Sequence, residues 1–187
     1  MSEASQRIAP GGVRQVGPLV WLFARVAGRV AGTEPPKLFL TLGRHRRLFW
    51  GWLHFAGRLM PGGRLPRRES ELVILRVAHL RGNRYEFTHH ERLGRRAGVT
   101  DHDLERIVTG LDTAGWSARE RSMLEAVDQL HHGKDIDDTA WHELRAHLSE
   151  REAIELCLLV GHYEMLATAL DALRVKEPDA VRGTAKR

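Results

Sequence analysis

The segment LPRRESELVILRVAHLRGNRYEFTHHERLGRRAGVTDHDL (residues 65–104) decides how this sequence is interpreted. Within it, Leu72–Leu80 is apolar on nearly every side of a helix, which is typical of a helix buried at the centre of a domain. A turn containing Gly82 and Asn83 follows, and a second helical pattern covers residues 85–97. The segment therefore predicts two consecutive helices, the first of them central.

Helical patterns continue on both sides of this segment, and no stretch alternates in the way a strand does. Ile154–Val160 is again apolar all round and predicts a second central helix. Two Ser-x-x-Glu capping boxes start helices, at Ser117 and Ser149. The further helices expected are Val16–Ala31, Lys37–Leu59, Arg67–Leu80, Thr100–Thr109, Ser117–His132, Asp138–Leu148 and Ser149–Val175. The pattern predicts an all-α compact bundle.

The length of 187 residues fits one globular domain, which we place at residues 16–175. Residues 1–15 show no periodicity and are expected to be a disordered N-terminus, and residues 176–187 a frayed tail. The helix expected at Lys37–Leu59 is rich in aromatic residues. Its excess apolar surface is explained equally well by core packing and by a subunit interface.

Composition and cysteine usage indicate a cytoplasmic protein. Hydrophobic residues make up 42% and charged residues 28%, which is ordinary for a soluble protein, and the net charge of +5 is modest. The single cysteine, Cys157, excludes a disulfide within the chain. The apolar stretch Pro18–Ala24 is too short to span a membrane, so no membrane partner is expected.

Candidate acid/base residues gather in the segment quoted first. Glu71 opens an otherwise apolar helix, although an acid in a first turn also simply favours the helix dipole. Glu86 and His90 are four residues apart and share one helix face, as an exposed ion pair also does. The residues that flank them are Asn83, Tyr85 and His89. A buried carboxylate beside an imidazole forms a proton-transfer pair.

This segment resembles the core motif of the carboxymuconolactone decarboxylase-like family of the alkylhydroperoxidase-D-like superfamily. The shared pattern is a Glu opening an apolar helix, a short turn, a Tyr-Glu-aromatic step, a His, and a helix ending in Ala-Gly-hydrophobic-Thr. The resemblance extends over about residues 36–175, including PPKLFLTLGRHRRLFWGWLHFAGRLMPGGRLP upstream and MLEAVDQLHHG and ELCLLVGHYEMLATALDAL downstream. It implies an alkylhydroperoxidase-D-like helical bundle.

The redox half of the superfamily's thiol site is missing. The thiol branch uses a Glu, a Cys-x-x-Cys pair and a His, and Glu71 and His90 stand at its two ends. The cysteine positions are occupied by Asn83 and Glu86, which can form neither a disulfide nor a reactive thiolate. Cys157 lies inside an apolar helix, where a cysteine is usually inert packing. We therefore expect no peroxidase activity.

The resemblance implies cofactor-free acid/base chemistry, of the decarboxylase or lyase type, on a small carboxylated or lactone substrate. Glu71 and His90 would form the acid/base pair, with Tyr85 and Glu86 orienting it. The residues expected to bind substrate are Arg76, Asn83 and His89. Arg76 would pair with a substrate carboxylate. A structural pair between Arg76 and an internal acid such as Glu155 is equally consistent with the sequence.

Three other classes of function remain open. A non-catalytic helical oligomer predicts a closed or dry space between Glu71 and His90; relatives in the superfamily form dimers, trimers or hexamers, so self-association is expected in either case. A metal site would combine Glu86 and His90 with His79 or His89, although we expect no metal. Nucleic-acid binding would rest on basic runs without a known motif, so no nucleic-acid partner is expected. These runs are Arg44-His45-Arg46-Arg47, Arg64 with Arg67-Arg68, and Arg95-Arg96.

Overall fold

The computed structural model of the chain describes residues 6–111 and 113–176, and in these residues it contains ten helices and no strand. The all-α prediction is confirmed. The chain divides into two compact units: Met1–Phe55 together with Ala169–Arg187, and Ala56–Thr168. The domain expected at residues 16–175 is thus made of the second unit and part of the first.

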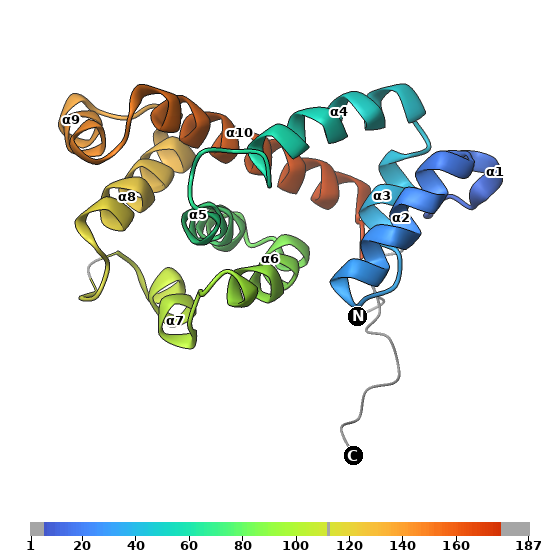
Figure 1. Cartoon of the computed structure of the whole chain (residues 1–187), viewed down its shortest axis with the longest axis horizontal. Helices are drawn as coiled ribbons and strands as arrows, with labels where there is room; N and C mark the ends of the chain where they lie inside the picture. Colours follow the sequence, from blue (N-terminus) through green and yellow to red (C-terminus); the bar gives the residue numbers. More distant parts are fainter. Residues whose placement is uncertain (1–5, 112, 177–187) are drawn as a thin grey trace, which may run out of the picture. The chain divides into compact units, whose positions relative to one another are not determined.

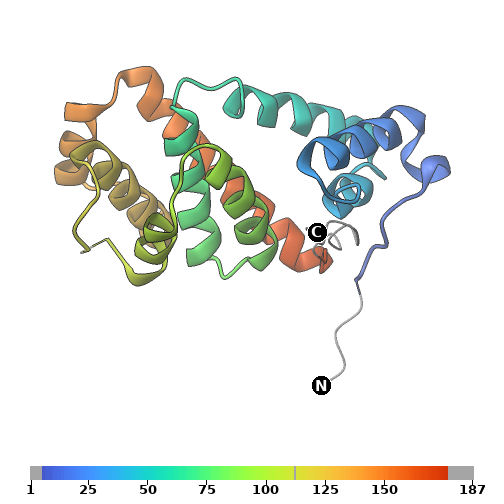
Figure 2. The same ribbon diagram turned by 60° about the horizontal axis from the view of Figure 1, so that its bottom comes forward.

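The second unit is built around helix α5, Arg67–Leu80. The other helices of this unit are α6 (Arg84–Arg96), α7 (Asp101–Thr109), α8 (Ala118–Gly133), α9 (Asp138–His147) and most of α10 (Glu150–Leu173). Helix α5 packs against α6, α7 and α8, and α9 packs against α8 (Figure 1). Figure 2 shows α5 and α6, in green, side by side. Every residue from Ser70 to Ala78 is buried, so α5 is the central helix that the sequence predicts.

Ion pairs hold α5 to its neighbours at its first turn. Arg68 Nη1 donates to Asp103 Oδ2 of α7 at 2.7 Å, and its Nε donates to Glu120 Oε1 of α8 at 3.1 Å. Asp103 also accepts from the backbone N–H of Thr100, which caps α7. Burial raises the pKa of Asp103, but Arg68 and Thr100 outweigh it and hold the pKa well below its usual range.

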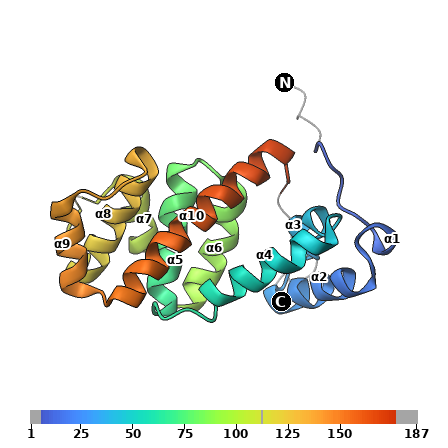
Figure 3. The ribbon, with the colours of Figure 1, turned by 90° about the horizontal axis from the view of Figure 1, so that it is seen from above.

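Helix α10 corrects one expectation. Leu156 and Leu159 are fully buried, but Ile154 is 60% and Leu158 47% exposed, so the segment Ile154–Val160 is not buried on all sides. Figure 3 shows α10 running across α5. Among the described residues, α10 is the one helix long and apolar enough to span a membrane, with a mean hydropathy of 1.4; 56% of that window is buried, and a core helix has the same composition.

The first unit contains α1 (Val13–Val16), α2 (Pro18–Ala31), α3 (Lys37–Leu42) and most of α4 (Arg46–Leu59). The single helix expected at Lys37–Leu59 is interrupted after Leu42. A Cβ on Gly43 would lie 2.5 Å from Val20 Cγ1, so the glycine lets the two segments approach. The rings of Phe23, Phe39 and Phe49 pack against one another, which uses much of the aromatic surface inside this unit.

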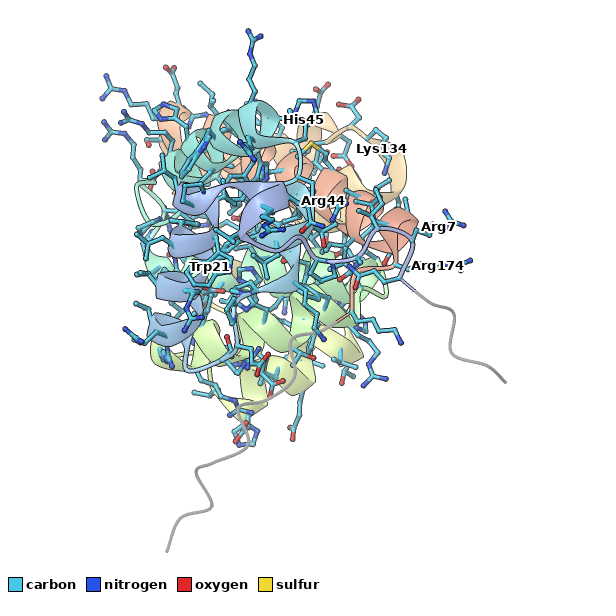
Figure 4. The ribbon with its side chains drawn as sticks, turned by 90° about the vertical axis from the view of Figure 1, so that its right-hand side faces the viewer. Arg7, Trp21, Arg44, His45, Lys134 and Arg174 are labelled. Carbon is cyan, nitrogen blue, oxygen red and sulfur yellow. The ribbon has the colours of Figure 1, made fainter. Side chains whose placement is uncertain are left out.

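The expectation of a disordered N-terminus is wrong for residues 6–15. The Arg7 N–H donates to the Leu173 carbonyl at 3.1 Å, which places Arg7 near Arg174 (Figure 4), and the Gly11 N–H donates to the Leu40 carbonyl at 2.9 Å. These bonds to distant residues leave no periodic signal in the local sequence. Residues 1–5 of that prediction, and residues 177–187 of the predicted frayed tail, lie outside the described residues.

Candidate acid/base site

Consecutive helices bring the predicted acid/base residues together. Glu71 lies on the buried face of α5, while Glu86 and His90 lie on α6. Helix α6 begins where the sequence places its turn, because Asn83 is the N-cap and its side-chain oxygen accepts from the Glu86 N–H at 2.9 Å. Asn83, which the sequence suggests as a substrate-binding residue, therefore has a structural role, because it fixes the helix turn that carries Glu86.

The imidazole of His90 stands between two buried carboxylates. His90 Nδ1 lies 2.7 Å from Glu71 Oε2, and His90 Nε2 lies 3.4 Å from Glu86 Oε2. The chain of charges continues beyond Glu71, because Arg67 Nη2 lies 2.6 Å from Glu71 Oε1. The side chain of Arg67 is 38% exposed, whereas that of Glu71 is 0% exposed. The site is thus a line of alternating charges that reaches solvent at Arg67.

His90 is protonated at neutral pH. Burial lowers its pKa, but the hydrogen bonds to Glu71 and Glu86 and the charges of both carboxylates outweigh burial and raise the pKa to about 9. Both ring nitrogens then carry protons, so Nδ1–H donates to Glu71 and Nε2–H faces Glu86. The resting site consequently stores one proton between two acceptors.

Three other titratable side chains surround this imidazolium. The ring of Tyr163, on α10, packs edge-on against His90 with centroids 5.0 Å apart. Burial, followed by the charges of Glu86 and Glu71, raises the pKa of Tyr163 well above its usual value. Burial, followed by repulsion from His90, lowers the pKa of His89 to about 3 and that of His162 to about 4. These neighbours are therefore neutral at pH 7, and His90 alone of the three histidines is charged.

One acceptor atom in the site is unused. Glu71 Oε1 and Glu86 Oε1 are both buried and accept no hydrogen bond from the described residues. Glu71 Oε1 has an ionic partner, because it lies 2.6 Å from Arg67 Nη2, whereas Glu86 Oε1 has none among the described residues. Leaving a buried carboxylate oxygen unpaired costs roughly 1–3 kcal/mol or more. An unsatisfied buried polar atom of this kind is uncommon in native proteins and is explained by strain, by a bound water or ion, or by a catalytic role.

Arg76 does not face the acid/base residues. Its Nε and Nη2 donate to the two oxygens of Asp128, on α8, at 2.7 and 2.6 Å, and its Nη1 donates to the Ile107 carbonyl at 2.5 Å. Three of its five N–H donors are thus engaged within the protein, so Arg76 forms a structural pair with Asp128 rather than with Glu155. That Arg76 also binds a substrate carboxylate stays a prediction. Arg67 is the cation that the structure brings to the site.

The remaining expected site residues lie close by without a shown role. Tyr85 is buried in the first turn of α6. The ring of His89 contacts that of His90, with centroids 5.2 Å apart. Within the described part of the chain, no three His, Cys, Asp or Glu side chains are placed to hold a metal ion. Both ring nitrogens of His90 face carboxylates, which explains why the i,i+4 spacing makes an ion pair here.

Sequence reasoning missed two residues of the site, Arg67 and Tyr163. Arg67 precedes Glu71 by four residues, so the i,i+4 rule could have found it. Tyr163 is distant in sequence from α6, and no local pattern marks it.

Comparison with known proteins agrees with the helical fold. Residues 46–129 match the profile of the carboxymuconolactone decarboxylase family, and no curated protein sequence matches the chain. A peroxidase-related protein from Silicibacter sp. TM1040 superposes with a TM-score of 0.83 at 18% identity, covering 96% of each chain.

Two further solved structures have the same fold. The alkylhydroperoxidase AhpD core protein from Ralstonia eutropha JMP134 gives a TM-score of 0.79 at 16% identity, covering 94% of this chain and 95% of that one. The debrominase Bmp8, a cysteine-to-alanine variant in complex with 2,3,4-tribromopyrrole, gives 0.78 at 17% identity, covering 96% and 95%. At such identities the likeness establishes the fold alone. Residues 46–129 thus match the carboxymuconolactone decarboxylase family, and the chain has the alkylhydroperoxidase-D-like helical fold.

Proposed function

We propose that this protein is a cofactor-free acid/base enzyme that moves a proton at a carbon next to a carbonyl, on a small carboxylated or lactone substrate. The observation that carries the proposal is the unpaired Oε1 of Glu86, backed by a protonated His90. A carboxylate that takes a proton from a neighbouring imidazolium can donate that proton to a substrate from its unpaired oxygen, and it then acts as a general acid. The same oxygen, once deprotonated, is a general base.

For a decarboxylation the step balances without a cofactor. The bond between the substrate carbon and its carboxylate breaks, its electron pair passes to the neighbouring carbonyl as an enolate, and CO₂ leaves. The proton of His90 passes to Glu86 and from Glu86 to the enolate carbon. A proton from water then restores the imidazolium of His90. Glu71 and Arg67 position the imidazole by fixing Nδ1. In this scheme Glu86 and His90 act on the proton and Glu71 is a positioning residue.

Exchange of substrate hydrogen for deuterium tests this proposal without knowledge of the natural substrate. A panel of small β-keto acids and carboxylated lactones is incubated with the protein in D₂O, and NMR follows both deuterium uptake and CO₂ release. We expect the Glu86→Gln variant to lose the activity by at least about a hundredfold, since general catalysis contributes roughly 10²–10⁴-fold. Glu91→Gln is the matched control on the same helix, because Glu91 pairs with Arg95 and its side chain is 35% exposed.

A non-catalytic helical oligomer is the second candidate, and burial favours it. Glu71 and His90 are in direct contact, and Glu71, Glu86 and His90 are each no more than 3% exposed. A buried ion-pair network of this kind also serves to specify a fold. Absence of exchange across the panel, with equal results for wild type and Glu86→Gln, would support this candidate and overturn the enzymatic one.

Self-association is proposed in both cases. Along α2, exposed apolar side chains recur at a spacing typical of paired helices: Leu19, Leu22, Val26 and Val30, each 51–74% exposed. A second copy of the chain is the occupant we propose for this stripe. We also propose a cytoplasmic location, on the grounds of the cysteine usage of the chain.

A further inference from the structure

A pocket of about 410 Å³ opens between the C-terminal ends of α5 and α8 and one face of α10. From α10 it is lined by Cys157, Gly161, Glu164 and Thr168, which share one helix face by their spacing of four, three and four residues. Tyr163, which packs on His90, is not in this lining. The pocket is therefore separate from the acid/base site, and its volume is that of a typical small-molecule site.

One N–H donor of Arg81, at the edge of this pocket, has no hydrogen-bond partner among the described residues. Arg81 Nη2 donates to Thr168 Oγ1 at 3.1 Å, and Arg81 Nε lies 3.7 Å from Glu164 Oε2, too far for a hydrogen bond. Arg81 Nε is buried and has no hydrogen-bond partner among the described residues. Glu164 is already engaged, because its Oε1 lies 2.6 Å from His131 Nδ1. The Nε–H of Arg81 is consequently left without an acceptor among the described residues, beside a pocket that could supply one.

A second cation lines the same pocket. Lys134 caps the end of α8 in the left-handed region, with φ 61°, and its ammonium donates to the His131 carbonyl at 2.5 Å. An ammonium has three donors, so further ones remain for a ligand. Arg81 and Lys134 oppose the single carboxylate of Glu164, which leaves the lining with one excess positive charge.

The rest of the wall is apolar. Leu130, Val160 and Met165 line it, and burial raises the pKa of the Cys157 thiol, so that this side chain is uncharged at neutral pH and does not repel an anion. An apolar wall with a few converging donors is the usual construction of a small-ligand site. We propose that this pocket binds a small monocarboxylate with an apolar body, held by Arg81 and Lys134, at a second site distinct from Glu71, Glu86 and His90.

Cys157 provides a direct test, because it is the single cysteine of the chain. The full chain is titrated with benzoate and, as a neutral molecule of the same shape, with benzamide, while the rate of Cys157 alkylation by N-ethylmaleimide is followed by mass spectrometry. We expect benzoate to slow alkylation saturably, at the Kd that calorimetry gives. Benzamide should bind at least about tenfold more weakly, since a charge-assisted hydrogen bond is worth roughly 1.5–3 kcal/mol.

Two variants locate the binding. Arg81→Gln and Lys134→Asn should each weaken benzoate about tenfold, and asparagine tolerates the positive φ of residue 134. If Arg81→Gln fails to fold, Lys134→Asn decides alone. Arg151→Gln removes an exposed positive charge from the same α10 and should change nothing.

Three results would overturn the proposal: equal binding of benzamide and benzoate, benzoate binding unaffected by Lys134→Asn, or a Cys157 that does not react in the ligand-free protein. The last result would mean that the pocket is closed in solution. Glu86→Gln should bind benzoate as the wild type does, which separates this site from the proposed acid/base function.

Discussion

The protonated His90 predicts how stability depends on pH. Its pKa is raised from 6.5 to about 9 in the folded protein, whereas in the unfolded chain it has its ordinary value. Between pH 6.5 and 9 the folded state therefore holds one proton more than the unfolded state. The contribution of His90 to the free energy of unfolding is fully present below pH 6.5 and is lost as the pH rises through 9. The difference of about 2.5 in pKa corresponds to roughly 3 kcal/mol, a large part of the stability of a small domain.

The buried neutral histidines affect the free energy of unfolding at acidic pH. The pKa of His89 is lowered to about 3 and that of His162 to about 4, so below pH 6.5 the unfolded chain binds protons that the folded protein does not. Their contribution is present above pH 6.5 and is lost as pH falls. The free energy of unfolding should therefore peak near pH 6.5 and decline in both directions.

Urea unfolding at half-unit steps from pH 5 to 9.5 measures this curve. Glu86→Gln removes one carboxylate from His90 and so lowers its pKa in the folded protein, which means that the alkaline decline should end at lower pH and be smaller in total. His102→Gln is the control, because His102 is an exposed histidine with a side chain 88% exposed. The reasoning is refuted if wild-type stability is flat from pH 6.5 to 9, or if the His90 ring resonances titrate near pH 6.5.

Other perturbations test the network, the chemistry and the assembly. Asp103→Asn removes two ion pairs and part of the Thr100 cap, so it should cost about 3 kcal/mol, seen as a lower Tm. Asp101→Asn, whose side chain is 74% exposed, should cost less than about 1 kcal/mol. Hydrogen peroxide and alkyl hydroperoxides should not be reduced in the presence of a dithiol, since no thiol pair faces His90. Leu22→Glu should lower the molar mass seen by light scattering after size exclusion; an unchanged mass would exclude the α2 stripe as the interface.

The fold could be predicted where local chemistry specifies it. Helix α5 has the predicted bounds, because Pro66 fixes its start and the apolar run that follows is buried from Leu72 to Ala78. The break after Leu42 was missed, since it depends on the approach of Val20 to Gly43 from another helix. The exposure of Ile154 was missed for the same reason: an apolar helix reveals nothing of how many of its faces are covered.

The candidate site, like the fold, could be predicted from the sequence only where its contacts are local. Glu71, Glu86 and His90 meet because two consecutive helices joined by a short turn pack together, which spacing along the sequence is able to indicate. The engagement of Arg76 by Asp128 could not be predicted, because many acids in the sequence could have reached it. Tertiary packing decides which partner a long side chain contacts. The sequence position of a cation near a candidate site residue therefore does not tell which neighbouring helix that cation faces.

Charge balance explains why the buried imidazole of His90 has two carboxylates beside it. With Arg67 and protonated His90 against Glu71 and Glu86, the formal charges of the buried line sum to zero. A neutral thiol at position 86 would leave His90 with one carboxylate, and its imidazolium would lose the partner of Nε2. The carboxylate instead stabilises the proton on His90, because uncompensated buried charge is costly. The contacts of Glu71, Glu86 and His90 thus favour a site that holds a proton.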